Sequence, residues 1–204
     1  MGDKLDWKKD LKSLYSPPSA PATVVVPPMR YLMLDGHGDP NHSAHYQAVL
    51  QALFSLAYTL KFAIKKAEGV DYAVYPAEGL WWVADMRLFT VAAKDDWDWT
   101  MMIAQPEVVT PAWVEESRAD ALKKKGLPLI ESVRFETYDE GCCAQIMHTG
   151  PFAEEGPNIA RLHAFIAAQG GSLAGKHHEI YLSDMRRTAP EKLKTVIRQP
   201  YVRP

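Results

Sequence analysis

Cysteine is scarce in this chain. The 204 residues include two cysteines, which are adjacent at Cys142 and Cys143. Neighbouring side chains on a strand point to opposite faces, so this pair predicts neither an ordinary disulfide nor a metal clamp. Because no disulfide framework is present, the sequence indicates a reducing, cytoplasmic location.

Long hydrophobic runs are also missing. The segment that comes closest to the roughly 18 apolar residues of a membrane helix spans 43–64 and carries His45, Gln47, Gln51 and Lys61. The first 14 residues are charged and lack the apolar centre of a signal peptide. We therefore expect no membrane partner.

Neither sign of charge dominates, since 23 Lys and Arg stand against 25 Asp and Glu, a formal net charge of −2. A charge balance of this kind does not predict nucleic-acid binding. The segment before the first expected strand is also expected to be too short for a helix-turn-helix domain. No P-loop, dinucleotide fingerprint or Gly-x-Ser-x-Gly motif occurs, and the histidines form no complete ligand set. We expect no cofactor, no metal and no direct nucleic-acid contact.

Aromatic residues, in contrast, are abundant, with six Trp, nine Tyr and six Phe. A chain of this length buries roughly 70% of its unfolded surface, which is enough for a hydrophobic core without stabilising disulfides or metal ions. Residues 1–23 are predicted to form a polar, Pro-rich arm, and residues 24–204 a single domain. The arm is the one candidate for contact with a protein partner, and no other feature supports such a contact.

Hydrophobic periodicity predicts both strands and helices. Thr110 and Pro111 mark one helix start, Gly126 marks its end, and Thr188 with Glu191 form a capping box for a last short helix. The expected strands span 24–26, 29–34, 71–75, 80–90, 97–105, 133–138, 142–148 and 177–183. The expected helices span about 43–66, 111–125, 151–169 and 190–197.

The order of these elements repeats. Residues of about 24–106 contain a strand, a long helix and further strands. Residues of about 130–200 contain the same elements in the same order, which predicts a β-α-β-β type of duplication. Two such units would join their sheets edge to edge and leave a concave surface between their helices. Small ligands usually bind in clefts of this kind.

Two carboxylates accompany aromatic side chains on expected strands. Glu179 and Tyr181 share one face of their strand, so they either line a cavity or leave Glu179 merely solvated. Glu78 precedes Trp81 and Trp82, of which one is expected in the core and one on a cavity wall, unless both only pack.

Two further acids, Glu154 and Glu155, open the helix of the second half. They either complement the helix dipole, or one of them faces Glu179 across the cleft. Paired carboxylates in an aromatic cavity could bind a lipophilic cation, or they could activate water.

Five sequence blocks stand out in combination. They are Leu-Asp-Gly-His-Gly-Asp-Pro-Asn at 34–41, Pro-Ala-Glu-Gly-Leu-Trp-Trp at 76–82, His-Thr-Gly-Pro-Phe at 148–152, His-Glu-Ile-Tyr-Leu at 178–182 and Arg-Arg-Thr-Ala-Pro-Glu-Lys-Leu at 186–193. Together they resemble the GyrI-like small-molecule-binding proteins. This resemblance extends over about residues 24–199 and implies an α+β fold, in which duplicated units form a curved antiparallel sheet with a ligand cavity between the repeats.

The family is similar to the effector-binding domains of multidrug-sensing transcription regulators. This similarity implies that Glu179 meets cationic aromatic compounds. Some stand-alone members hydrolyse the cyclopropane ring of DNA-alkylating natural products, which implies catalytic roles for Glu155 and Glu179. The expected ligand-binding residues are Tyr58, Glu78, Trp82, Trp113, Glu179 and Tyr181.

Two departures from the family pattern, Ala77 where Leu is usual and Phe54 where Tyr is usual, leave the ligand open. Two functions therefore remain. One is a cytoplasmic binding protein for amphipathic aromatic or cationic compounds. The other is a hydrolase that opens cyclopropane rings by carboxylate-assisted attack of water.

Overall fold

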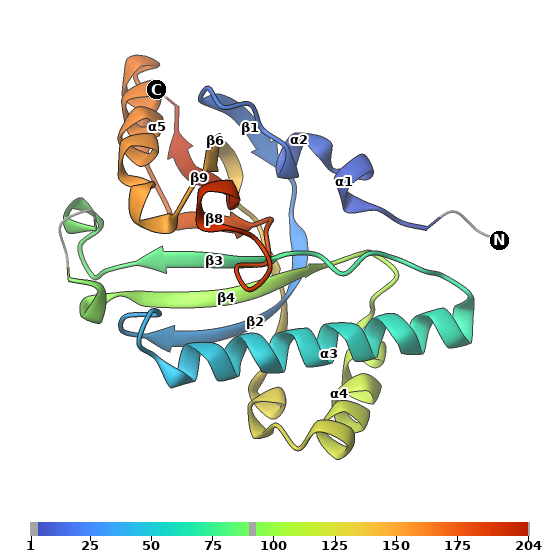
Figure 1. Cartoon of the computed structure of the whole chain (residues 1–204). Helices are drawn as coiled ribbons and strands as arrows, with labels where there is room; N and C mark the ends of the chain where they lie inside the picture. The colour runs from blue at the N-terminus through green and yellow to red at the C-terminus, as the bar shows by residue number, and fades with distance from the viewer. Residues whose placement is uncertain (1–3, 90–92, 204) are drawn as a thin grey trace.

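One open antiparallel sheet organises the fold of this computed structural model, which describes residues 4–89 and 93–203 (Figure 1). The strand order is β1-β6-β9-β8-β3-β4-β2-β5, and β7 pairs with β9 beside this path. The strands are β1 (Ala22–Val26), β2 (Met29–His37), β3 (Ala77–Trp82), β4 (Asp98–Gln105), β5 (Arg134–Tyr138), β6 (Gly141–Thr149), β7 (Ser172–Leu173), β8 (His177–Tyr181) and β9 (Lys194–Val202).

The helices α3 (Ala44–Glu68) and α4 (Pro111–Lys125) begin and end within two residues of where the sequence predicts. The Ser43 side chain accepts a hydrogen bond from the Tyr46 amide at the start of α3, and Thr110 does the same for Trp113 at the start of α4. Gly126 ends α4 in the left-handed conformation, with φ of 61°. The helices are α1 (Trp7–Asp10), α2 (Lys12–Tyr15), α3 (Ala44–Glu68), α4 (Pro111–Lys125) and α5 (Gly156–Ala168).

The predicted duplication is present. The first unit is β2-α3-β3-β4 and the second is β6-α5-β8-β9, and their sheet orders, β2-β4-β3 and β6-β9-β8, mirror each other. The units meet where β3 pairs with β8. The flanking strands are exchanged, because β1 pairs with β6 of the second unit and β5 pairs with β2 of the first. The fold is therefore α+β with an antiparallel sheet shared by both units.

Both long helices lie on one face of the sheet. Leu53 and Leu56 of α3 are buried in a cluster with Trp99 of β4. Leu162 of α5 is buried with Ile197 of β9. Since each helix covers its own unit, the β3–β8 junction lies between the two helices.

The opposite face of the sheet carries the N-terminal arm. Trp7, Leu14 and Tyr15 are buried there in a cluster that includes Ile180 of β8 and Val196 of β9. α1 and α2 lie beside β1 in Figure 1. The domain boundary at residue 24 stays a prediction.

Four expected elements differ in the structure. The helix expected over 151–169 is preceded by the 3-10 turn η4 (Phe152–Glu154), and α5 begins at Gly156. Instead of a helix over 190–197, η5 (Pro190–Lys192) is a single 3-10 turn, and β9 follows because Thr195, Val196 and Ile197 are β-branched and buried. Within 71–75 only Tyr72 pairs, in an isolated bridge with Leu5. The strand expected over 80–90 runs from Ala77 to Trp82 and gives way to η1 (Met86–Leu88), while Thr90 lies outside the described residues.

α3 is long and apolar enough to cross a membrane by length and composition. In this fold its residues Val49, Leu53, Leu60 and Ile64 are fully buried in the protein core. One face of the helix therefore belongs to the core, whereas Tyr58 and Phe62 on another face are exposed.

Candidate functional site

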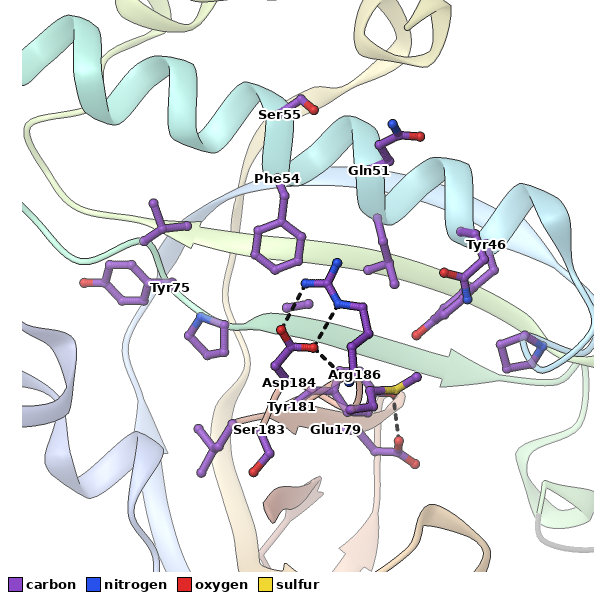
Figure 2. Close-up of a pocket in the computed structure, with 18 of the residues that line it drawn as sticks. Tyr46, Gln51, Phe54, Ser55, Tyr75, Glu179, Tyr181, Ser183, Asp184 and Arg186 are labelled. Atoms are coloured by element: carbon purple, nitrogen blue, oxygen red, sulfur yellow. Dashed lines mark hydrogen bonds and ion pairs between the residues drawn. The ribbon is translucent and has the colours of Figure 1, made fainter. Parts of the chain in front are cut away.

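A groove of about 2340 Å³ lies between α3 and α5, above the β3–β8 junction, and continues along α3 to α4. Figure 2 shows Tyr46 and Phe54 reaching from α3 toward Glu179 and Tyr181 on β8. Both units supply walls, so the groove is the cleft that the duplication predicts.

Glu179 lies at the centre of a hydrogen-bonded row on this face. Its side chain is 12% exposed. Tyr181 Oη donates to Glu179 Oε2 over 2.8 Å and accepts from Trp81 Nε1 over 3.0 Å. His177 Nε2 lies 3.1 Å from Glu179 Oε1 and donates to it. Burial alone would raise the pKa of Glu179, but the bonds from His177 and Tyr181 outweigh it and lower the pKa, so the carboxylate is ionised.

Aromatic rings surround this carboxylate. The Trp81 ring lies 6.2 Å from the Tyr46 ring and 5.7 Å from the Trp97 ring, centroid to centroid. Phe89 of the segment after β3 stacks on Trp97 at 4.9 Å. Phe152, in η4 (Phe152–Glu154), meets Tyr181 edge-on at 5.5 Å. The walls are thus suited to flat apolar rings.

Glu155 lies beside Glu179 and has the opposite protonation state. It occupies the N-cap position of α5 without a capping hydrogen bond from its side chain, and it is 4% exposed. Burial, together with the negative charge of Glu179, raises the pKa of Glu155 to about 10. The pair therefore presents a neutral acid and an ionised base to the same groove at neutral pH.

Three of the predicted site residues, Glu155, Glu179 and Tyr181, lie together in the groove wall. The prediction for Trp82 is wrong, because alternation along β3 puts Trp81 on the groove side and Trp82 on the other face. On that face Trp82 packs against a buried cluster that includes Tyr31 and Leu80, and the Lys176 ammonium lies 3.2 Å from its ring centroid.

Glu78 lies on the same face of the sheet as Trp82, opposite the long helices, and does not line the groove. Its carboxylate is fully buried, accepts from Tyr15 Oη at 2.8 Å and lies 3.0 Å from His178 Nε2. His178 Nδ1 in turn lies 2.9 Å from Glu140, which also bonds Arg198 at 3.1 Å. The charges of the two carboxylates are balanced by those of His178 and Arg198. This network therefore belongs to the interior beneath the sheet and not to the groove.

The protonation states of this network follow from its contacts. Burial would lower the pKa of His178, but Glu140 and Glu78 raise it to about 9. Burial would likewise raise the pKa of Glu140, but His178 and Arg198 lower it to about 2. His178 is thus a cation at neutral pH.

Tyr58 and Trp113 line the groove away from Glu179. Tyr58 is 47% exposed and stacks between Phe54 and Phe62 along α3. Trp113 Nε1 donates to Glu68 Oε1 at 2.7 Å, where α4 meets α3. These residues extend the apolar surface but do not touch the row around Glu179.

Sequence reasoning left open whether Trp81 or Trp82 faces the groove, and it missed three residues that complete the site, namely Trp97, Phe89 and His177. Strand alternation could have identified His177, because it lies two residues before Glu179 and therefore on the same face of β8 as Glu179 and Tyr181. Among residues 4–89 and 93–203, no group of three or more His, Cys, Asp or Glu side chains could hold a metal ion.

Comparison with known proteins gives one family. The family model of the GyrI-like small molecule binding domain matches residues 20–202. No curated protein matches the chain. A crystal structure of an uncharacterized conserved protein from Listeria innocua shares 39% identity and a TM-score of 0.90, covering 98% of this chain and 100% of that chain.

Two further solved structures bear on function and fold. A crystal structure described as a hydrolase from Listeria innocua shares 38% identity and a TM-score of 0.85, over 98% of this chain and 100% of that chain. The EcmrR C-terminal domain shares 12% identity and a TM-score of 0.58, over 90% of this chain and 98% of that chain. The second likeness shows the fold alone.

Proposed function

The chain belongs to the GyrI-like small-molecule-binding family, and from this premise we propose that its groove binds amphipathic aromatic compounds, above all cationic ones. The observation that carries the proposal is the ionised Glu179 within walls formed by Trp81, Trp97 and Tyr46. A cation gains both from the carboxylate and from the ring faces in such a site. The free thiols of Cys142 and Cys143 support a cytoplasmic location for this activity.

Binding of a flat cationic dye tests the role of Glu179. Replacing Glu179 by Gln keeps the shape of the side chain and removes the charge. We expect the Kd for ethidium, measured by fluorescence titration, to rise at least about tenfold, equivalent to about 1.4 kcal/mol. The Kd for coumarin, a neutral ring compound, should change less than about twofold.

A matched control is Glu154→Gln, because Glu154 precedes Glu155 in the same turn and is exposed. This variant should bind ethidium like the wild type. Equal ethidium affinity in Glu179→Gln and the wild type would contradict the proposed role of the charge.

A second function, hydrolysis of a strained electrophilic ring, is favoured by the opposite protonation of Glu155 and Glu179. A 38%-identical structure described as a hydrolase supports it. For a cyclopropane conjugated to a dienone, Glu179 would take a proton from water as its oxygen bonds to the ring methylene. The ring C–C bond breaks, its electron pair moves to the dienone oxygen, and Glu155 protonates that oxygen to give a phenol.

Proton transfer between the two carboxyl groups would also restore their starting protonation states. After the reaction Glu179 holds the proton of water and Glu155 has lost its own. Because each group shifts the pKa of the other, they lie close together, and we expect the proton to pass from Glu179 to Glu155.

Product analysis tests this second function. We expect the wild type and Glu154→Gln to convert a spirocyclopropyl cyclohexadienone to its ring-opened hydrate, detected by mass spectrometry. Glu155→Gln and Glu179→Gln should each lower the rate at least about 100-fold, since general acid–base groups contribute 10²–10⁴. Binding without any hydrate in the wild type would exclude the hydrolase.

A further inference from the structure

A turn that follows β8 borders the groove and carries a planar cation. Asp184, Met185 and Arg186 of this turn line the groove, as does Phe54 of α3. Figure 2 shows the Arg186 side chain extending from the turn toward Phe54. A guanidinium in this wall would repel cationic ligands unless its charge is balanced by a neighbouring group.

Asp184 supplies that balance and also holds the turn. Its carbonyl oxygen accepts hydrogen bonds from the amides of Arg187 and Thr188 at 3.0 and 2.9 Å. Its carboxylate accepts from the Arg186 amide at 3.0 Å, and from Nε and Nη2 of the same guanidinium at 3.0 Å each. Two parallel bonds between one guanidinium and one carboxylate fix the plane of both groups. Arg186 is therefore held in one orientation with its charge compensated.

The ion pair occupies one edge of the Arg186 guanidinium and leaves its two faces available. The side chain is 86% exposed, although it lines the groove. Guanidinium faces stack on aromatic rings by planar contact and by cation–π attraction, which the compact ammonium of Lys does not reproduce. A free planar face beside an aromatic wall is therefore suited to a flat ring of the ligand.

The size of the groove indicates that a ligand needs such a contact. Its volume of about 2340 Å³ exceeds the roughly 300–1,000 Å³ of most small-molecule pockets, which bury most of the ligand surface. Trp81 and Tyr46, whose rings lie 6.2 Å apart, offer aromatic contacts from β3 and α3. A small flat compound on this wall would leave much of its surface in water unless another group covers it.

We propose that the Arg186 guanidinium, held flat by Asp184, stacks on planar fused-ring ligands in the groove and selects them over compounds that lack a flat ring. This inference rests on the first proposed function. Stacking depends on the ring face, so Arg186 favours neutral and cationic flat compounds alike. Glu179 adds the preference for a positive charge, and the two residues thus read different properties of one ligand.

The variant Arg186→Lys tests stacking, because it keeps the positive charge and removes the planar group. We expect the Kd values for ethidium and for neutral coumarin, measured by fluorescence titration, each to rise at least about threefold. Arg187→Lys is the matched control. Arg187 follows Arg186 directly, is 87% exposed, lies 3.9 Å from Asp184 and does not line the groove. Both Kd values should stay unchanged in this control.

A nuclear magnetic resonance titration gives a second readout that an effect on the turn alone would not produce. Ring currents shield a proton that lies over the face of an aromatic ring. We therefore expect the Nε–H proton signal of Arg186 to move upfield when ethidium or coumarin binds, and that of Arg187 to stay in place.

The outcomes separate this inference from the function on which it rests. If Arg186→Lys binds both dyes like the wild type, or binds ethidium more tightly, the stacking role is overturned. If Glu179→Gln weakens ethidium binding while Arg186→Lys does not, the proposed function stands and only the role of Arg186 falls. If the wild type binds neither dye, the proposed function fails and stacking fails with it.

Discussion

Glu155 and Glu179 differ in what surrounds them rather than in chemistry. Glu179 accepts bonds from His177 and Tyr181, and these favour its charged form. Glu155 has a buried oxygen without a partner in the described chain, and the neighbouring charge opposes its ionisation. Two identical side chains therefore take opposite protonation states at neutral pH.

The raised pKa of Glu155 predicts a pH-dependent stability. In the unfolded chain Glu155 ionises near pH 4.3, but in the folded chain it keeps its proton up to about pH 10. As pH rises between these values, the unfolded state releases a proton that the folded state retains, so this residue makes the protein progressively less stable. Glu155→Gln removes the effect.

We therefore expect Glu155→Gln to gain stability over the wild type as pH rises from 5 to 9. The gain should be at least about 1.4 kcal/mol, the free energy of one pKa unit, in urea unfolding followed by tryptophan fluorescence. Glu154→Gln should show no such trend. Parallel stability curves for Glu155→Gln and the wild type would mean that Glu155 is ionised in the fold.

At the scale of elements, β8 serves two different sites through its two faces. His177, Glu179 and Tyr181 face the groove, while His178 joins the buried network on the other side. The arm reaches that network, since Tyr15 of α2 donates to the buried Glu78. The arm thus contributes to the central strands through a hydrogen bond to a charged group.

Removal of this bond predicts a measurable loss. Tyr15→Phe leaves one oxygen of a fully buried carboxylate without its donor, which should lower the free energy of unfolding by about 1.5–3 kcal/mol in urea denaturation. Tyr58→Phe, at a 47% exposed tyrosine, is the control and should change it by less than about 0.5 kcal/mol. A Tyr15→Phe variant as stable as the wild type would show that the arm does not stabilise the strands through Glu78.

Much of the element plan could be predicted from local sequence, and the site only in part. Ser43, Thr110 and Gly126 mark helix ends because capping depends on neighbouring atoms. The capping box at Thr188 could not reveal β9, because pairing with β6 and β8 decides that segment. Trp81 and Trp82 could not be told apart, since strand alternation separates two faces without saying which face the helices cover.

At the scale of the whole molecule, the groove depends on the junction of two units. β3 brings Trp81 from the first unit, and β8 brings Glu179 and Tyr181 from the second. The exchange of β1 and β5 ties each unit to the other's sheet. A ligand bound in the groove would contact both units at once and would therefore stabilise the folded chain as a whole.

The nearly balanced charge of the molecule gives a last prediction. With a formal net charge of −2, the protein surface offers little long-range attraction for a cation, whereas Glu179 is 12% exposed within aromatic walls. Salt screens exposed charges strongly and buried ones weakly. The Kd for ethidium should therefore change less than about threefold between 50 and 500 mM NaCl, measured by fluorescence titration. Glu179→Gln should weaken binding by the same factor at both salt concentrations. A steep salt dependence that persists in Glu179→Gln would instead locate dye binding on the exposed acidic surface.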